Sequence, residues 1–316
     1  MPTGFFTHDL CQVYDQGKGN PESAARIEAI EDQMIASGLA RLVVPLPSAQ
    51  ASMEDVLRAH DESFVQELRE ASLRAQTNSS ACSSQMSPDT EINARSFEAA
   101  MKSAGAAIEA VRQVCSGKLR NAFACVRPPG HHAGRAFAHG FCLINSVACA
   151  ALHALDAIGL KRVAILDIDV HRADGTEDIV KNDPRIRLFS LYQESAFPYG
   201  LPAATAGNIF NLPLAEGTEG SDVIGLVSRQ WLPRLLEFKP ELILVSAGFD
   251  AHRDEKQALL KLTEFDYSYL TYEIMRVARA VCGGRIVSIL EGGYNIRSLA
   301  RSAVAHITTL ARGVRD

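Results

Sequence analysis

Asp167, Asp169 and His171 alternate within one short segment of the sequence. In an extended chain, residues two apart lie on the same face, so Asp169 and His171 can hold one ion together. Asp250 follows a separate apolar segment and can complete a set of two carboxylates and one histidine. Three protein ligands with one open position are typical of a catalytic metal site. This mixture of oxygen and nitrogen ligands suits Zn²⁺, with Fe²⁺ as the alternative ion. A polar turn without a metal is the other interpretation of the segment.

The adjacent histidines His131 and His132 have side chains suited to acid–base chemistry, because imidazole titrates near neutral pH. Two prolines stiffen the chain before them, and the glycine that follows the prolines permits a tight turn. Each imidazole then needs a carboxylate to orient its other ring nitrogen, and Asp167 and Asp174 are the acids available for this purpose. The alternative is that one of the two histidines only packs in the interior.

Tyr294 follows two glycines, Gly292 and Gly293. A tyrosine hydroxyl at a site of this kind can donate a hydrogen bond to an oxyanion that develops during a reaction. Ordinary packing at the rim of the site is the alternative. A phosphate-binding loop is not indicated, because the chain has no Gly-x-Gly-x-x-Gly motif and no Lys-Ser/Thr pair after these glycines.

The elements that position these residues can be predicted from the apolar pattern of the chain. Short and mostly apolar segments predict buried strands at 121–126, 162–167, 185–191, 241–247 and 285–290. Helical patterns occur at 96–114, 145–158, 221–237 and 263–282. This alternation predicts an α/β fold with a central parallel β-sheet and helices on both faces, and we expect one domain over residues 1–316.

Local signals mark some of the boundaries of these elements. Asn145, Ser221 and Thr263 are residues of the type that caps the start of a helix, and Gly283 is a stop signal. The polar, serine-rich segment 77–90 predicts a long surface loop.

Polar segments follow four of the predicted strands, at 127–132, 167–175, 248–250 and 291–294. In a parallel α/β sheet, ligands bind beyond the carboxyl ends of the strands. The candidate residues are therefore expected to meet at one edge of the sheet.

The composition narrows the classes of function. The chain has 316 residues, of which 47% are apolar and 22% charged, as in ordinary globular proteins. A net charge of −5 and the absence of a basic stripe argue against nucleic-acid binding. The sequence has no long apolar run and no signal-peptide pattern, so no membrane association is expected. Seven cysteines without CxxC spacing argue against a disulfide framework and favour a reducing, cytoplasmic compartment.

Several motifs resemble those of the histone deacetylase superfamily, in particular its class II and bacterial histone deacetylase-like members and the acetylpolyamine amidohydrolases. The matching segments are RPPGHHA at 127–133, GFCLIN at 140–145, DIDVH at 167–171 with DGT at 174–176, SAGFDAH at 246–252 and EGGY at 291–294. The segment GNPE at 19–22 and Arg26 are similar to the opening motif of that family. The resemblance covers about residues 8–300.

The resemblance implies an arginase/deacetylase-type α/β fold and a Zn²⁺-dependent hydrolase that cleaves the C–N bond of linear amides. By motif position, Asp169, His171 and Asp250 correspond to the metal ligands. A structural K⁺ is also implied. The residues that match the nearer of the family's K⁺ sites are Asp167, Asp169, His171, Ser190 and Leu191.

The resemblance also assigns catalytic roles. His132 corresponds to the general base and acid, supported by Asp174. His131 corresponds to its electrostatic partner, supported by Asp167, and Tyr294 corresponds to the donor to the oxyanion.

Four further residues correspond to substrate-binding positions. Phe141 and Phe197 are similar to the aromatic walls of an acyl-lysine tunnel, and Gly140 lies in the same channel segment. Asp89 lies about where relatives hold the substrate backbone at the rim. The implied substrates are acylated lysine side chains or acylated small amines.

The sequence departs from the family pattern at two places. Relatives usually have a second histidine and a glycine after the ligand histidine, whereas this chain has Arg172 and Ala173. We hypothesise that Arg172 pairs with a carboxylate and leaves activity intact. Near the tunnel mouth, relatives usually have Pro-Leu where this chain has Lys256 and Gln257, a change that bears on substrate preference.

Two other classes of function compete with a deacylase. An arginase-like ureohydrolase with two Mn²⁺ ions needs another carboxylate two residues after Asp250, and His252 stands there. A non-catalytic acyl-lysine-binding or scaffold protein is the second alternative. A homo-oligomer is compatible with each of these functions.

Overall fold

An eight-stranded parallel β-sheet forms the centre of the computed structural model, which describes residues 1–17, 19–77 and 84–313. The strand order is β2-β1-β5-β10-β9-β6-β7-β8. The strands are β1 (Thr3–Thr7), β2 (Val43–Pro47), β5 (Asn121–Ala124), β6 (Val163–Asp167), β7 (Ile186–Gln193), β8 (Ile209–Leu214), β9 (Leu242–Ala247) and β10 (Ile286–Leu290). All neighbouring pairs in this sheet are parallel.

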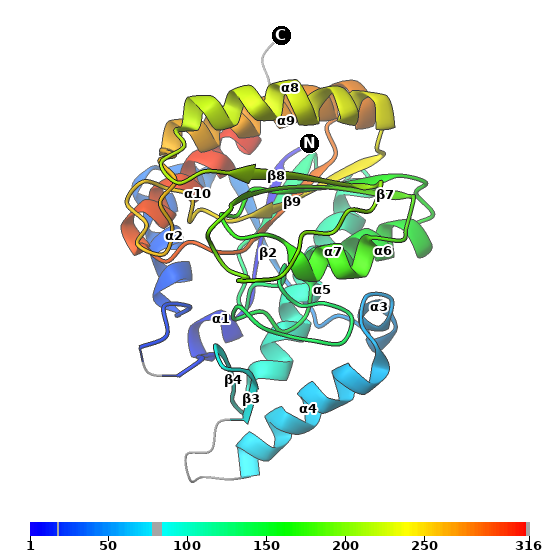
Figure 1. Ribbon diagram of the computed structural model, residues 1–316, viewed down its shortest axis with the longest axis vertical. Coiled ribbons are helices and arrows are strands. Elements are labelled where there is room, and N and C mark those ends of the chain that lie inside the picture. Colours follow the sequence, from blue (N-terminus) through cyan, green and yellow to red (C-terminus); the bar gives the residue numbers. More distant parts are fainter. Residues whose placement is uncertain (18, 78–83, 314–316) are drawn as a thin grey trace.

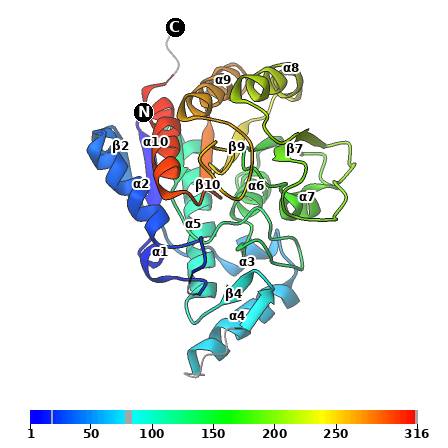
Figure 2. The ribbon, with the colours of Figure 1, turned by 60° about the vertical axis from the view of Figure 1, so that its left-hand side comes forward.

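Helices cover both faces of the sheet (Figure 1). One layer contains α2 (Ala25–Ala36), α8 (Gly220–Phe238), α9 (Glu264–Cys282) and α10 (Ile296–Arg312). The opposite layer contains α5 (Ser96–Cys115), α6 (Ser146–Asp156) and α7 (Asp174–Val180). The short helices are α1 (Leu10–Val13), the 3₁₀ helix η1 (Leu39–Arg41) and α3 (Met53–Leu57). Helix α4 (Glu62–Thr77) projects beyond these layers at the same end of the molecule as α3 (Figure 2).

The predicted fold class is confirmed, and each of the five predicted strands is present within a few residues of its expected ends. Strands β6, β9 and β10 are buried along their whole length, which explains their continuous apolar sequences. Strands β1, β2 and β8 were not predicted. Both edge strands contain prolines, and most residues of β2 are exposed, so neither has the pattern of a buried strand.

Helix boundaries follow the local signals with one exception. Asn145 accepts a hydrogen bond from the Ala148 amide and caps α6, while Thr263 forms a capping box at the start of α9. Gly283, with φ 63°, ends α9 in the left-handed conformation. The expected cap at Ser221 was wrong, because α8 begins one residue earlier.

The segment 77–90 is only partly a loop, which corrects the prediction. Residues 84–87 form β3 (Ser84–Ser87), which pairs antiparallel with β4 (Thr90–Ile92), and residues 78–83 lie outside the described part. Asp89 stabilises the turn between the strands, because its carboxylate accepts hydrogen bonds from the hydroxyls of Ser87 (2.6 Å) and Thr90 (2.9 Å). The hairpin thereby fixes the carboxylate of Asp89.

Across the described residues, no helix combines the length and the apolar character that a membrane crossing requires. The six cysteines within the described residues have free thiols, and five of them are buried.

A buried network of two arginines and one glutamate joins the amino-terminal segment to the sheet. The Glu22 carboxylate accepts hydrogen bonds from Arg127 (2.5 and 2.9 Å) and from Arg26 (3.1 Å). All three residues are at most 1% exposed. Arg26 also donates to the main-chain oxygens of Glu291 and Gly293, so the network supports the segment after β10.

Glu22→Gln should destabilise the protein by about 3–5 kcal/mol, because it leaves two buried guanidinium groups without a counter-charge. Urea unfolding of the variant and the wild type measures this loss. The matched control is Glu54→Gln, which breaks an ion pair to Arg58 at a side chain that is 80% exposed and should cost less than about 1 kcal/mol. Equal losses for the two variants would contradict the assignment.

Candidate active site

The carboxyl ends of four adjacent strands, β5, β10, β9 and β6, bring the candidate residues together. Asp167 is the last residue of β6, and Asp250 lies three residues after the end of β9. The histidine pair follows β5, and Tyr294 follows β10. The sheet order therefore places side chains from distant parts of the sequence around one point.

Asp169, His171 and Asp250 form a buried group whose ligand atoms all lie within 4.8 Å of one another. His171 Nδ1 is 2.9 Å from Asp169 Oδ1 and 3.3 Å from Asp250 Oδ2. Backbone amides hold the other oxygens: Gly292 N donates to Asp169 (2.8 Å), and Val170 N donates to Asp250 (2.9 Å). Both carboxylates are thus fixed facing the same histidine nitrogen.

The donor set fits a bound cation. Asp250 Oδ2 is buried without a hydrogen-bond partner. Burial, together with the neighbouring Asp169 carboxylate, raises the pKa of Asp250 to about 6. Glycines leave the space around these oxygens free, because a Cβ at Gly248 would lie 2.1 Å from Asp169 Oδ2 and one at Gly292 would lie 2.0 Å from Asp250 Oδ2. A cation here would relieve the repulsion between the two carboxylates.

Each of the adjacent histidines is oriented by its own carboxylate. His132 Nδ1 is 2.6 Å from Asp174 Oδ1, and His131 Nδ1 is 3.2 Å from Asp167 Oδ2. The two rings lie 4.0 Å apart. Burial and the adjacent His131 lower the pKa of His132 to about 3, so its ring is neutral and its remaining nitrogen, Nε2, is free to accept a proton.

A cavity of about 290 Å³ opens over these groups. Its lining residues are Asp89, His132, Gly140, Phe141, His171, Phe197, Tyr199, Gln257 and Tyr294. The ring of Tyr294 contacts Phe141 (5.7 Å between centroids) on one side and the guanidinium of Arg26 (5.1 Å) on another. The structure therefore gathers the predicted acid–base, oxyanion and tunnel residues around one space.

Asp89 and Gly140 are linked through the main chain. The Gly140 amide donates to both carboxylate oxygens of Asp89, at 3.2 and 3.1 Å. Gly140 has φ +56°, and a Cβ there would lie 2.5 Å from His132 Cδ2. A larger residue would push into the His132 ring, so glycine is required at this point of the wall.

The histone deacetylase domain family matches residues 20–310 of this chain. The chain belongs to the histone deacetylase family. A protein named "Probable deacetylase" from Archaeoglobus fulgidus is 34% identical over 304 residues, covering 94% of this chain and 82% of the archaeal protein. "Polyamine deacetylase HDAC10" of Mus musculus is 34% identical over 315 residues, but this chain spans only 46% of that protein. The crystal structure of the HDA15 HD domain shares 30% identity with a TM-score of 0.89, covering 98% of this chain and 89% of that chain.

In this member of the histone deacetylase family, the residues predicted to hold K⁺ lie at and after the end of β6 and in the second half of β7. Strand pairing places Asp167 opposite Ser190, with Leu191 next in the chain. The Ser190 hydroxyl accepts a hydrogen bond from the Ala173 amide at 3.4 Å. Asp167 and Ser190 are thus brought together, and the binding of K⁺ by the five residues stays a prediction.

His252 contacts residues outside the Asp169–His171–Asp250 group. It stands at the position where an arginase-like enzyme needs a carboxylate. Its Nδ1 accepts a hydrogen bond from the Asp254 amide (3.0 Å), and its Nε2 lies 3.5 Å from Glu264. Among the described residues, the group around Asp250 therefore offers three ligands, which suits one ion better than two.

Arg172, which replaces the family's usual histidine, pairs with a carboxylate, as hypothesised. Its Nη1 donates to the Leu201 carbonyl (2.6 Å), and its Nε lies 3.7 Å from Glu177 Oε2. The positive charge of Arg172 is thus paired with the carboxylate of Glu177.

Arg172→His is accordingly expected to change kcat less than tenfold, since the ion pair to Glu177 supports structure and lies outside the cavity lining. Steady-state kinetics on the metal-loaded proteins measure this. A tenfold or larger rise in turnover would show that the arginine restrains catalysis.

Three residues in this region carried no individual role in the sequence analysis. The Glu291 carboxylate accepts hydrogen bonds from the amides of Gly130 (2.7 Å) and His131 (3.1 Å), and Glu255 accepts one from the Tyr294 amide (2.8 Å). Tyr199 lines the cavity mouth and is 75% exposed. Glu291 lies within the EGGY motif, which is a usable signal, whereas nothing in the sequence marks Glu255 or Tyr199.

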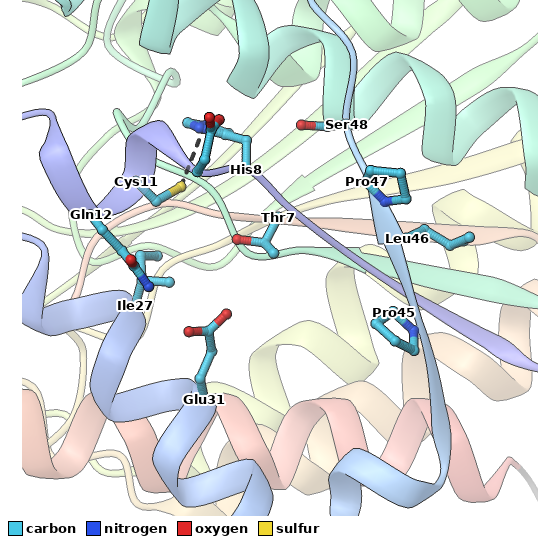
Figure 3. A pocket seen from close by; sticks show the side chains of 11 residues that line it. Thr7, His8, Cys11, Gln12, Ile27, Glu31, Pro45, Leu46, Pro47 and Ser48 are labelled. Atoms are coloured by element: carbon cyan, nitrogen blue, oxygen red, sulfur yellow. Dashed lines mark hydrogen bonds between the residues drawn. The ribbon is translucent and has the colours of Figure 1, made fainter.

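A second cavity, of about 510 Å³, lies between β2, α1 and α2 (Figure 3). It is lined in part by Glu31 and Pro45, and by His8, whose Nε2 is 3.4 Å from Cys11 Sγ. None of the predicted site residues lines it, so it is separate from the site described above.

Proposed function

We propose that this chain is a Zn²⁺-dependent deacylase that cleaves the amide of an acylated lysine side chain or an acylated small amine. The observation that carries the proposal is the arrangement around one cavity. The Asp169–His171–Asp250 group, the His132–Asp174 pair and Tyr294 all meet there. Metal-ligating, proton-transferring and hydrogen-bond-donating groups in one cavity are the components of amide hydrolysis.

When bound by Asp169, His171 and Asp250, Zn²⁺ supplies a Lewis acid that polarises the amide carbonyl and lowers the pKa of water. His132 Nε2 accepts the proton of the attacking water, while Asp174 stabilises the imidazolium that forms. Tyr294 donates a hydrogen bond to the developing oxyanion. His132 then gives its proton to the leaving amine, so the products are a carboxylic acid such as acetate and a free amine.

The remaining residues have roles in binding. Phe141 and Phe197 form apolar walls for the alkyl chain of the substrate, and Asp89 at the rim attracts a cationic or amide-bearing group. Asp167, Ser190 and Leu191 would hold K⁺ beside the end of β6, where the ion would support the segment that carries Asp169 and His171. A cytoplasmic location is proposed together with this function, since the described cysteines are free thiols.

An activity panel with metal analysis tests the proposal. Zn²⁺-loaded protein is incubated with an acetyl-lysine peptide, acetylputrescine, acetylspermidine and a trifluoroacetyl-lysine probe, and bound metal per chain is counted. Turnover of one acetyl substrate with one metal per chain supports the deacylase and identifies its substrate class. Two metal ions per chain would favour a dinuclear ureohydrolase, and one bound Zn²⁺ without turnover of any substrate would favour an acyl-lysine-binding protein.

A further inference from the structure

Asp174, the carboxylate that orients His132, has a second histidine partner. His132 Nδ1 lies 2.6 Å from Asp174 Oδ1, and His139 Nε2 lies 2.7 Å from Asp174 Oδ2. Among the described residues, no other side chain forms a hydrogen bond or ion pair with this carboxylate. The mechanism proposed above uses His132 and leaves His139 without a role.

His139 is held firmly in place. Its ring packs edge-on against Phe137 (5.2 Å between centroids) and Phe197 (5.0 Å), and the ring of His132 is 5.6 Å away. The next residue, Gly140, is fixed by its hydrogen bonds to Asp89. These contacts restrict the ring to an orientation in which Nε2 faces Asp174.

His139 is outside the cavity that contains the reacting groups. Its side chain is 19% exposed, and it is not part of the cavity lining, so it does not contact the substrate's acyl group. Any influence on the reaction therefore passes through the residues that His139 contacts, which are Asp174 through a hydrogen bond and Phe197 and His132 through packing.

We infer that His139 is a positioning residue that fixes the carboxylate plane of Asp174 and thereby the ring orientation of His132. A carboxylate bound at one oxygen can rotate about its Cβ–Cγ bond, whereas donors at both oxygens fix it. Asp174 is only 7% exposed, so water would replace the lost donor poorly. The role in turnover rests on the proposed function, whereas the geometric role does not.

The same two hydrogen bonds keep Asp174 ionised. Burial alone would raise the pKa of this carboxyl group, but the bonds from His132 and His139 hold it well below its ordinary value. An ionised and immobile carboxylate favours the His132 tautomer with its proton on Nδ1, which leaves Nε2 as the base.

Two variants of His139 separate the hydrogen bond from packing. His139→Leu keeps an apolar side chain against Phe137 and Phe197 but removes the donor. His139→Gln retains an amide N–H near the position of Nε2. With Zn²⁺-loaded protein and whichever panel substrate is turned over, we expect kcat of the Leu variant to fall about 10–30-fold with KM changed less than twofold. We expect the Gln variant to keep at least about a third of the wild-type kcat.

A second measurement does not depend on turnover. Two-bond ¹⁵N–¹H correlation spectra of histidine-labelled protein report the tautomer of His132. We expect the Nδ1–H form in the wild type and the Gln variant, and a mixture of forms in the Leu variant. Thermal unfolding of all three proteins shows whether each is folded at the assay temperature.

The outcomes separate the two proposals. If the wild type turns over no panel substrate, the proposed function fails and the spectra alone decide the role of His139. An unchanged His132 tautomer in the Leu variant overturns the inference. Equal losses of kcat in the Leu and Gln variants overturn it as well, because packing would then explain the loss.

Discussion

Asp250→Asn should lower metal affinity at least about a hundredfold and turnover about a thousandfold. The amide oxygen can still accept the hydrogen bond from Val170, so the segment keeps its place. The amide nitrogen, however, would stand where Oδ2 now faces His171 Nδ1 at 3.3 Å. An amide nitrogen offers no lone pair to a cation, and one anionic ligand would be lost. Metal content after dialysis and kcat/KM with added Zn²⁺ measure the two effects.

Asp254→Asn is the matched control for this variant. Asp254 lies four residues further along the same segment, and its side chain is 48% exposed and pairs with Arg301. It should retain the wild-type metal content and turnover. A fully metal-loaded and active Asp250→Asn protein would remove Asp250 from the ligand set and with it the proposed metal centre.

The second large effect is expected at Tyr294. Tyr294→Phe removes a single hydroxyl while the ring keeps its contacts with Phe141 and Arg26. If the hydroxyl donates to the oxyanion, kcat should fall about 10²–10³-fold while KM stays nearly constant, because the bond forms only as the oxyanion develops. Steady-state kinetics on the panel substrate measure both constants.

Tyr269→Phe on α9 is the control, since its ring lies outside the cavity lining and is 39% exposed. It should have wild-type kinetics. A Tyr294→Phe protein with unchanged kcat would show that Tyr294 only packs at the rim, which is the alternative stated from the sequence.

The parts of the site that follow from strand ends could be predicted from sequence. Asp169 and His171 directly follow an apolar strand, and parallel topology brings Asp250 to the same edge. The supporting contacts could not be predicted in this way. Glu22 and Arg127 are 105 residues apart, and they meet only because the segment before α2 folds against the segment after β5. His139 reaches Asp174 only after its loop has folded against the start of α7, and its local sequence carries no signal for that contact.

The segment 77–90 shows another limit of sequence analysis. Its composition favours a loop, and yet residues 84–92 form a hairpin. The Asp89 carboxylate stabilises this hairpin, because it accepts hydrogen bonds from hydroxyl groups on both sides of the turn. Side-chain hydrogen bonds of this kind depend on exact turn geometry, which polar composition does not specify. The predicted rim position of Asp89 depends on that hairpin.

The two edge strands bear on how copies of this protein can associate. Extension of a β-sheet from one chain to the next needs main-chain N–H donors along the exposed edge. In β2, Pro45 and Pro47 lack that donor, and in β8 Pro213 lacks it. These edges therefore resist edge-to-edge pairing and the aggregation that it can start. An oligomer of this chain would have to form through its helices and loops, leaving the sheet confined to a single copy.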